Sequence, residues 1–305
     1  MIGPPRSPHA PPHNMPHTEV NPPPPTDRLR HFPHLESEAH HPSAWPFPAS
    51  LAASPAHWLA CLRELYAMPI SFPASLSPDA GMLLHALVKN LRPRVIVEVG
   101  TFCSVSTHWI AGALLEAGKR PGIDAVIHCI DDFTPIEPGP WRDAAMPEGR
   151  LEFVRARLTR AGLIDYVRLH QGNSSYVVTD LQEQLTALGG VDLAFLDGDH
   201  GILGATSDFL AVEPVLNTGG YVLLHDTFPD QCGGYDGPRY ILDHVRTRRN
   251  ASPDPHANPG RHAKPAPPVD EIPPDRKPLG QGIYDRVDLY LSPLNYGMGL
   301  LRRLE

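Results

Sequence analysis

Two apolar runs of the sequence end in residues that can carry a proton or bind a metal ion. Val191–Leu196 is followed by Asp197-Gly198-Asp199-His200, and Tyr221–Leu224 is followed by His225-Asp226. If both runs are neighbouring strands, roughly 4.8 Å apart, Asp197 and Asp226 stand side by side at one edge of a sheet. Adjacent carboxylates repel each other unless a cation or a shared proton lies between them. Oxygen ligands with an open face suit a hard divalent ion such as magnesium, so the pattern predicts Asp197 and Asp226 as metal ligands.

Two histidines lie beside these acids, and each has two interpretations. Neighbouring residues of a strand point to opposite faces, so His225 and Asp226 both face the site only if the strand has already ended. As a ligand, His225 would shift the site toward manganese, iron or zinc; the alternative is a packed histidine behind the ligands. His200 is a candidate general base, because an imidazole pKa of about 6.5 lets it accept a hydroxyl proton near neutrality. The alternative for His200 is a loop histidine that caps the following helix.

A second group of candidate residues follows three earlier apolar runs. After Arg94–Val99 comes the loop 100–106, where Gly100 allows a close backbone approach and the amides opening the next helix can receive a carboxylate. Asp131-Asp132 follows Ala125–Ile130, and a carboxylate there can accept both hydroxyl groups of a ribose. Gln171-Gly172-Asn173-Ser174 follows Tyr166–His170. Each feature alone could end a strand or cap a turn, but three consecutive strand ends together favour a nucleoside site.

The elements that position these residues alternate regularly from about residue 57. β-branched apolar runs predict buried strands, and amphipathic segments predict helices. A repeating strand–helix order predicts a parallel sheet with helices on both faces. The predicted strands are 94–99, 125–130, 166–170, 191–196 and 221–224, and the predicted helices are 57–66, 82–91 (opened by Ser77-Pro78-Asp79), 106–117, 148–161, 176–188, 206–216 and 238–248.

The C-terminal part of the sequence departs from this alternation. Arg286–Leu291 and Gly299–Leu304 are predicted strands with only a short turn between them, and such strands must be antiparallel. The predicted fold is therefore α/β and Rossmann-like, with a seven-stranded, mostly parallel sheet that ends in an antiparallel hairpin. That ending, together with the lack of a G-x-G-x-x-G fingerprint, disfavours a nicotinamide-dependent enzyme.

Proline is concentrated in two segments that cannot build a helix or a central strand. The chain has 37 prolines, many of them in residues 1–55 and in residues 252–278. Both segments also lack the apolar residues that would offset the entropy of ordering. We therefore predict a disordered Pro/His-rich tail at 1–55 and one domain at 56–305, with a Pro-rich insertion at about 250–280.

Charge and cysteine content narrow the partners and the compartment. A net charge of -8 with scattered Lys and Arg argues against nucleic acid, and the cluster Arg246-Arg248-Arg249 is predicted to complement a helix dipole. No apolar run approaches a membrane span. Cys61, Cys103, Cys129 and Cys232 show no paired spacing, which predicts free thiols in the cytoplasm. A small-molecule partner is expected, and assembly into a homo-oligomer is left open.

The segment from Glu98 to Ser106 resembles motif I of class I methyltransferases, particularly the catechol O-methyltransferase-like enzymes and the antibiotic sugar O-methyltransferase and cephalosporin hydroxylase-like group. Their pattern is E-h-G-x-x-x-G-x-S with h apolar; Glu98, Gly100 and Ser106 match, and Ser104 stands at the second glycine. The resemblance spans roughly 77–245 and 283–304. It implies S-adenosylmethionine as the methyl donor. The donor-binding residues that it implies are Glu98, Gly100, Thr101, Phe102, Ser106, Asp131 with Asp132 as runner-up for the ribose, Asn173 and Ser174.

The same resemblance implies roles for the acid and histidine residues. In metal-dependent members the acids matching Asp197 and Asp226 bind magnesium, the position of His225 is often an acid, and the histidine of D-x-x-H, His200 in this sequence, is the proposed base. The expected reaction is in-line methyl transfer to a hydroxyl of a small molecule, a sugar or a phenol on a natural product. Two alternatives remain: a non-catalytic donor- or partner-binding module with Pro-rich interaction arms, and a hydroxylase-like relative.

Overall fold

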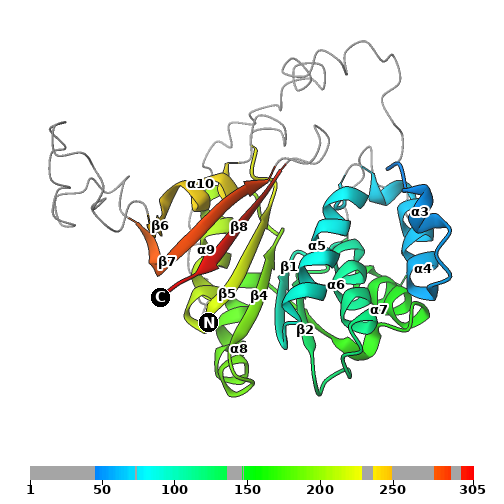
Figure 1. Cartoon of the computed structure of the whole chain (residues 1–305), viewed down its shortest axis with the longest axis horizontal. Helices are drawn as coiled ribbons and strands as arrows, with labels where there is room; N and C mark the ends of the chain where they lie inside the picture. Colours follow the sequence, from blue (N-terminus) through cyan, green and yellow to red (C-terminus); the bar gives the residue numbers. More distant parts are fainter. Residues whose placement is uncertain are drawn as a thin grey trace, which may run out of the picture.

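The computed structural model describes residues 45–72, 74–135, 146, 148–228, 236–248, 278–289 and 297–305. In these ranges the chain forms one twisted sheet between two layers of helices (Figure 1). The strand order is β3-β2-β1-β4-β5-β8-β7-β6, and β1 to β5 pair in parallel. The predicted α/β fold with a mostly parallel sheet is therefore confirmed.

The elements have the following bounds. The strands are β1 Val95–Val99, β2 Val126–Asp131, β3 Val167–Gln171, β4 Val191–Leu196, β5 Leu216–His225, β6 Val245–Thr247, β7 Leu279–Leu289 and β8 Met298–Arg303. The helices are α3 Ala49–Ala52, α4 His57–Tyr66, α5 Pro78–Leu91, α6 Val105–Glu116, α7 Arg150–Arg160, α8 Ser174–Ala187, α9 Ile202–Val212 and α10 Gly237–His244, with short 3-10 turns at Pro69–Ser71, Ile164–Tyr166 and Glu213–Val215.

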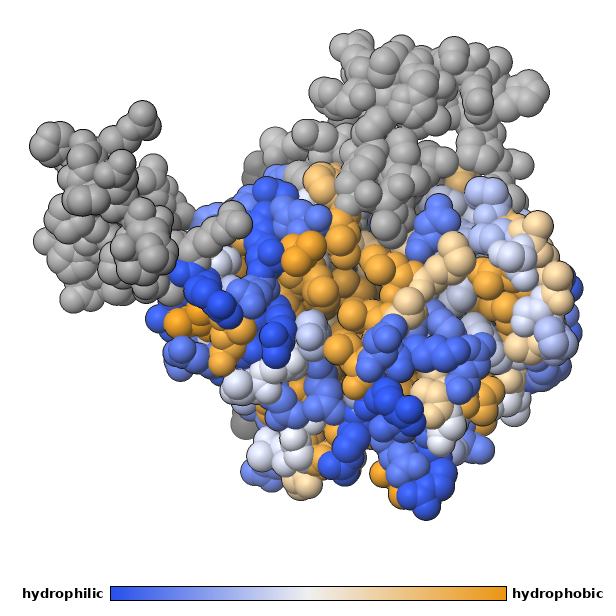
Figure 2. Space-filling view, viewed as in Figure 1, coloured by the Kyte–Doolittle hydropathy of each residue, from blue (hydrophilic) through white to orange (hydrophobic). Residues whose placement is uncertain are grey.

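Two apolar cores fill the space on the two faces of the sheet. Helices α4 to α7 bury Trp58, Leu84 and Trp109 against one face, and helices α8 to α10 bury Phe209 and Ile241 against the other. Strand β1 is buried along its whole length because it faces both cores. In the space-filling view, apolar residues gather in the middle of the face toward the viewer, with hydrophilic residues around them (Figure 2).

The predicted antiparallel ending is confirmed, but the sheet has eight strands in the described ranges instead of seven. Strand β8 runs antiparallel to β5 and to β7. The helix predicted at 238–248 ends at His244, and Val245–Thr247 continues as β6, an edge strand parallel to β7. Val245 is buried, so the chain leaves the helix to bring a β-branched side chain into the second core.

This early helix end also changes the interpretation of the arginine cluster. Arg246 lies in β6 and donates to the carbonyl of Gln281, and Arg248 pairs with Asp285 at 3.3 Å. Both side chains therefore bind β7, so their predicted role at a helix terminus is wrong. Arg249 lies outside the described residues.

The predicted tail boundary at residue 55 is too late. Trp45 is buried, its indole Nε1 donates to the Ser71 carbonyl at 2.9 Å, and helix α3 follows. Indole burial with a satisfied N–H is what attaches 45–55 to the domain. Residues 1–44, the insertion at 249–277, Cys232 and most of the loop 133–147 with Trp141 lie outside the described residues. No helix in the described ranges is long and apolar enough to cross a membrane.

A buried carboxylate anchors the start of β7. Glu213 lies directly after α9 and is 5% exposed. Its two oxygens accept hydrogen bonds from the amides of Gln281 and Gly282 and from the Tyr284 hydroxyl, at 2.9–3.0 Å. These charge-assisted bonds explain why β7 begins at Leu279, seven residues before the start predicted at Arg286.

Glu213→Gln should lower the free energy of unfolding by about 2 kcal/mol. The glutamine NH₂ group would face N–H and O–H donors that the wild-type carboxylate accepts from, so some of these hydrogen bonds would be lost. Urea unfolding measures the loss. Glu183→Gln, on an exposed position of α8, is the matched control and should change stability by less than about 0.5 kcal/mol. Equal effects for the two variants would contradict the anchoring role of Glu213.

Candidate functional site

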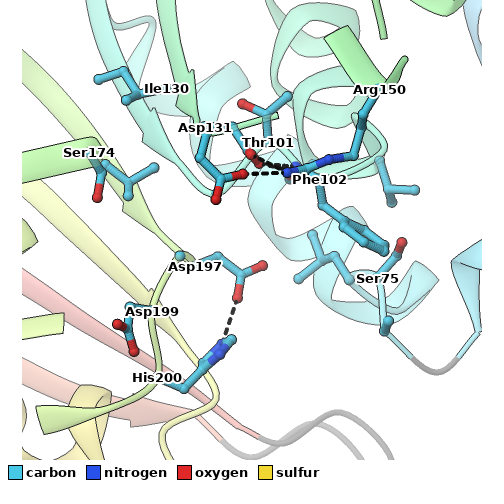
Figure 3. Close-up of a pocket in the computed structure, with 18 of the residues that line it drawn as sticks. Ser75, Thr101, Phe102, Ile130, Asp131, Arg150, Ser174, Asp197, Asp199 and His200 are labelled. Atoms are coloured by element: carbon cyan, nitrogen blue, oxygen red, sulfur yellow. Dashed lines mark hydrogen bonds and ion pairs between the residues drawn. The ribbon is translucent and has the colours of Figure 1, made fainter. Parts of the chain in front are cut away.

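A cavity of about 430 Å³ opens where β1, β2, β4 and β5 end (Figure 3). In open α/β sheets, ligands bind beyond the carboxyl ends of the strands, and this cavity lies there. Most of the predicted site residues line it: Gly100, Thr101, Phe102, Ser106, Asp131, Asp132, Asn173, Ser174, Asp197, His200 and Asp226. The wall also contains Ser75, Leu76, Arg150 and Asp199. Glu98 and His225 are the two predicted site residues that do not line it.

Gly100 joins the loop after β1 to the loop after β4. Its φ is +89°, and a Cβ at this position would lie 2.1 Å from the carbonyl oxygen of Asp197. The glycine is therefore required by the contact between two loops of the protein itself. This contact fixes the first candidate donor residue against the first candidate metal ligand.

Ser104 takes the left-handed conformation that a glycine would take. Its φ is +72°, and its amide donates to the Thr101 carbonyl at 2.7 Å. Phe102 is also left-handed, with a φ of +48°, and its amide donates to Asp131 at 2.8 Å. The loop thus keeps its turns without the second glycine of the motif, with hydrogen bonds opposing a strain of roughly 1–2 kcal/mol per residue.

Glu98 supports the loop from below the cavity. It is fully buried, and its Oε2 accepts hydrogen bonds from the hydroxyls of Thr107 at 2.6 Å and Thr101 at 3.4 Å. Burial raises the pKa of this carboxyl, with opposing hydrogen bonds from Thr107 and Ser106. In this structure Glu98 contacts the loop and does not reach the cavity.

His108 fastens the same loop from the first turn of α6. The Ser104 carbonyl accepts from the His108 amide at 3.0 Å and lies 2.7 Å from its Nδ1. The ring is buried, and burial lowers the pKa of His108 to about 4. The sequence prediction missed this residue, since a single histidine inside a buried, mostly apolar helix carries no distinguishing pattern.

Arg150, at the start of α7, lies against Asp131, the last residue of β2 (Figure 3). Its Nη1 donates to one carboxylate oxygen of Asp131 at 3.0 Å, and its Nη2 lies 2.7 Å from the other in an ion pair. The amides of Phe102 and Phe133 fill the other acceptor positions of Asp131, at 2.8 Å each. Arg150 also contacts Asp132 at 2.7 Å. The sequence prediction missed Arg150, because the helix pattern of 148–161 does not show that its first arginine contacts the end of a strand.

The segment after β3 is held by a buried acid of α9. Asn173 caps α8 through its side chain, which accepts from the Tyr176 amide, and the Ser174 hydroxyl donates to Asp208 at 2.5 Å. Asp208 is 3% exposed, and burial raises its pKa to about 6. Asp208 was also missed, since it lies eleven residues beyond the Asp197 motif on a helix face.

Two acids and two histidines meet at the ends of β4 and β5. His225 Nδ1 lies 3.0 Å from an oxygen of Asp197 and 3.0 Å from an oxygen of Asp226. His200 Nε2 lies 2.7 Å from Asp226 and 3.5 Å from Asp197. Figure 3 shows His200 turned toward Asp197 across the cavity floor. The structure therefore places Asp197 and Asp226 close together, as the sequence predicted.

A backbone turn lets both His225 and Asp226 face this cluster. Strand β5 ends at His225, and Asp226 has a φ of +56°. The alternation of side chains along a strand ends with the strand, so the next residue can return to the same side. Aspartate tolerates the left-handed region better than most residues. Asp199, by contrast, accepts from the Gly201 amide at 2.7 Å and forms the turn before α9.

The carboxylates and imidazoles shift each other's protonation. Burial alone would lower the pKa of His200, but its hydrogen bonds to Asp197 and Asp226 raise it to about 10. Burial likewise opposes the charge of His225, yet the charges of Asp226 and Asp197 raise its pKa well above the ordinary value. Burial opposes the charge of Asp226 too, but the two histidines hold its pKa well below the usual range. In the protein alone, positive imidazoles therefore balance the two carboxylates.

The sheet order, the glycine loop after β1, and the acids at the ends of β2, β4 and β5 make this domain similar to class I methyltransferases. Residues 97–227 match the family model described as "Methyltransferase domain". The matched segment runs from β1 to just beyond Asp226, so it includes the glycine loop and the acid and histidine cluster. The resemblance stated for the sequence is confirmed by this match.

Known proteins similar to this chain agree with that class. A catechol O-methyltransferase of Niastella koreensis is 27% identical over 125 residues, which cover 41% of this chain and 46% of that protein. The chain spans about half the length of the curated relatives it matches. Its fold is similar to an O-methyltransferase from Bacillus cereus (TM-score 0.50, 16% identity, 81% of this chain and 91% of that one) and to a methyltransferase from Geobacter sulfurreducens (TM-score 0.50, 17% identity, 86% and 100%).

Gly100→Ala should lower the free energy of unfolding by at least about 3 kcal/mol and weaken donor binding at least about tenfold, since the new methyl group collides with the Asp197 carbonyl. Gly118→Ala is the matched control, because Gly118 has a φ of +68° and a methyl group there would meet no atom within 4 Å. It should lose only about 1 kcal/mol and bind the donor as the wild type does. Urea unfolding and calorimetric titration measure both. Similar losses in the two variants would show that backbone strain, and not loop contact, requires Gly100.

His108→Asn should make the free energy of unfolding depend less on pH between 6.5 and 4. The unfolded histidine takes up a proton near pH 6.5, whereas the folded one does so only near pH 4, so acidification between these values stabilises the unfolded state. The wild type therefore loses stability as pH falls below 6.5, with His108 contributing up to about 1.4 kcal/mol per pH unit. Asparagine keeps a donor for the Ser104 carbonyl and cannot titrate. An unchanged slope in chemical denaturation between pH 6.5 and 4 would rule out this role.

Proposed function

We propose that this chain is an S-adenosylmethionine-dependent O-methyltransferase that uses a divalent cation to methylate a hydroxyl of a small molecule, a sugar or a phenolic natural product. One observation carries the proposal. A single cavity has the glycine loop and Asp131 on one wall, and Asp197, His200 and Asp226 on the other. A donor on the first wall would present its methyl group toward an acceptor on the second.

The donor wall has the groups that a nucleoside with an amino acid tail requires. The amides that open α6 can receive the donor carboxylate, as helix N-termini do. Asp131 is the proposed ribose acceptor, and the Arg150 guanidinium now contacts both of its oxygens, the two atoms that a vicinal diol would also contact. We infer that the ribose hydroxyls replace Arg150 on Asp131, while Arg150 keeps Asp132 and the Thr134 carbonyl. Asn173 and Ser174 then line the adenine end of the cavity.

The opposite wall fits a divalent cation. Asp197, His225 and Asp226 each offer one ligand atom, and these atoms all lie within 4.8 Å of one another. Two carboxylates at this spacing require positive charge between them, which the imidazoles supply in the protein alone. A bound divalent cation would polarise an acceptor hydroxyl and lower its pKa. Magnesium is the cation that the class of enzyme suggests.

His200 is placed to handle the hydroxyl proton. Its Nε2 reaches both carboxylates from the loop after β4, and its side chain is 26% exposed toward the cavity. With a pKa raised to about 10 it is protonated at neutral pH, so it can act as a base only when another positive charge neutralises Asp197 and Asp226. This links proton acceptance at Nε2 to occupancy of the cation site.

The remaining contribution of the protein is alignment. The Gly100 contact places the proposed donor loop directly against the end of β4, so the reacting groups would be presented from two walls that touch each other. Such orientation supplies much of the acceleration in two-substrate reactions. Cys61, Cys103 and Cys129 are free thiols, which suits the reducing cytoplasm where we place the enzyme.

Asp197→Asn should bind S-adenosylmethionine within about threefold of the wild type but transfer methyl at least about 100-fold more slowly to a catechol or vicinal-diol acceptor with magnesium present. Calorimetry measures binding, and tritiated methyl transfer measures turnover. Asp199→Asn is the matched control, because Asp199 forms a turn two residues away and should retain most of the turnover.

Three results would contradict parts of the proposal. No binding of S-adenosylmethionine by the wild type would exclude the donor assignment. Donor binding without turnover on any hydroxyl acceptor would favour the donor-binding module. Full turnover of Asp197→Asn after treatment with a chelator would exclude the cation.

A further inference from the structure

The proposed cation site contains a ring nitrogen where an all-oxygen site would have a third carboxylate. We propose that His225 binds the cation through Nδ1 and thereby makes the site select transition-metal ions such as Mn²⁺, Co²⁺ or Zn²⁺ over Mg²⁺. The inference rests on the proposed function, because it requires a cation at Asp197 and Asp226. It assigns to His225 a specificity that the methyl-transfer reaction itself does not demand.

The geometry places Nδ1 as an equal member of the donor set. Nδ1 lies 3.0 Å from one oxygen of Asp197 and 3.0 Å from one oxygen of Asp226. Ligand atoms at neighbouring corners of an octahedron are about 3.0 Å apart when each bond to the ion is about 2.1 Å long. Nδ1 therefore already has the spacing of a ligand toward both carboxylates.

Burial directs the ring into the site. His225 is 5% exposed, and its backbone pairs with Met298 of β8 on one side of the central strand β5. Its other ring nitrogen, Nε2, is buried with no hydrogen-bond partner among the residues that the structure describes. All polar contacts of the ring found in those residues are thus on the side of Asp197 and Asp226. The turn at Asp226 keeps both neighbours facing the same point.

Ligand chemistry then decides between ions. Mg²⁺ prefers oxygen ligands and keeps several waters, whereas neutral imidazole suits Mn²⁺, Co²⁺ and Zn²⁺. With two carboxylates and one imidazole, the set has fewer negative charges than three acids would supply. Both properties weaken Mg²⁺ relative to a transition-metal ion of similar size.

The competing explanation is that the positive charge of His225 takes the place of a cation, so that the site needs no metal ion. In the protein alone its imidazole is paired with two acids, and His200 provides a second positive ring, so the four side chains can balance their charges without an ion. In that case no metal would bind tightly, and exchange of His225 would alter stability but no metal preference. The experiment must therefore detect the nitrogen at the ion directly.

Calorimetric titration of the chelator-treated full chain with MgCl₂ and with MnCl₂ gives the selectivity. The wild type should bind Mn²⁺ at least about 100-fold more tightly than Mg²⁺, and His225→Asp should reduce that ratio to about tenfold or less by restoring an all-oxygen set. Circular dichroism spectra and thermal unfolding of each variant show whether it is folded. If His225→Asp does not fold, His225→Asn provides the same comparison.

Pulsed electron paramagnetic resonance of the Mn²⁺ complex detects a bound imidazole through its coupling to ¹⁴N. The coupling should be present in the wild type and in His200→Gln, and absent in His225→Asn and His225→Asp. A coupling that survives in both His225 variants, or an Mn²⁺ to Mg²⁺ ratio that His225→Asp leaves unchanged, would overturn the inference.

The outcomes separate this inference from the proposed function. Tight binding of Mg²⁺ and Mn²⁺ with equal affinity and no ¹⁴N coupling rejects the role of His225 and leaves the methyltransferase intact. No binding of either ion by the wild type rejects the inference together with the cation of the proposed mechanism. Binding of S-adenosylmethionine, measured in the same preparations, tests the donor site independently of both.

Discussion

The contact between Gly100 and the carbonyl of Asp197 is the constraint on which the site depends. Strands β1 and β4 are neighbours in the sheet, but parallel pairing alone would leave their loops free to diverge. The missing side chain at residue 100 lets one loop rest on the other, so two functional walls share a single rigid seam. Glu98 and His108 then secure the first loop from within the core.

On both walls of the cavity, carboxylates are paired with positively charged side chains of the protein. On the donor wall, Asp131 and Asp132 share one guanidinium, that of Arg150. On the other wall, Asp197 and Asp226 share two imidazoles. In each case carboxylates that a ligand would need are already satisfied by the protein. Under the proposed function, ligand binding at either wall would be an exchange of partners, so that these acids would not stand unpaired at any stage.

The sequence predicted the sheet core and the positions of the acids because both depend on local patterns. Continuous β-branched runs identify β1, β2 and β4, and a polar residue directly after such a run must lie at the sheet edge. What it could not predict depends on distant contacts. Arg150 reaches Asp131 from the next helix, and Glu213 binds amides 68 residues further along the chain. The replacement of the last predicted helical turn by β6 has the same origin. The conformation of Val245 is set by its burial in the second core and not by its sequence neighbours. Whether His225 and Asp226 face the same site was left open for a similar reason, because it depends on the left-handed backbone of Asp226 just after the strand.

The left-handed backbone of Asp226 has a consequence for how such chains can be told apart. A β-branched residue cannot occupy that conformation without strain, whereas Asp, Asn and Gly can. A chain of this fold with Val, Ile or Thr at the equivalent position would continue the strand, and that residue would then point to the face opposite its predecessor. The identity of the residue after the fifth strand thus separates sequences that can direct two adjacent side chains to one point from sequences that can direct only one side chain there. That distinction can be made from the residue letters alone, before any activity is assayed.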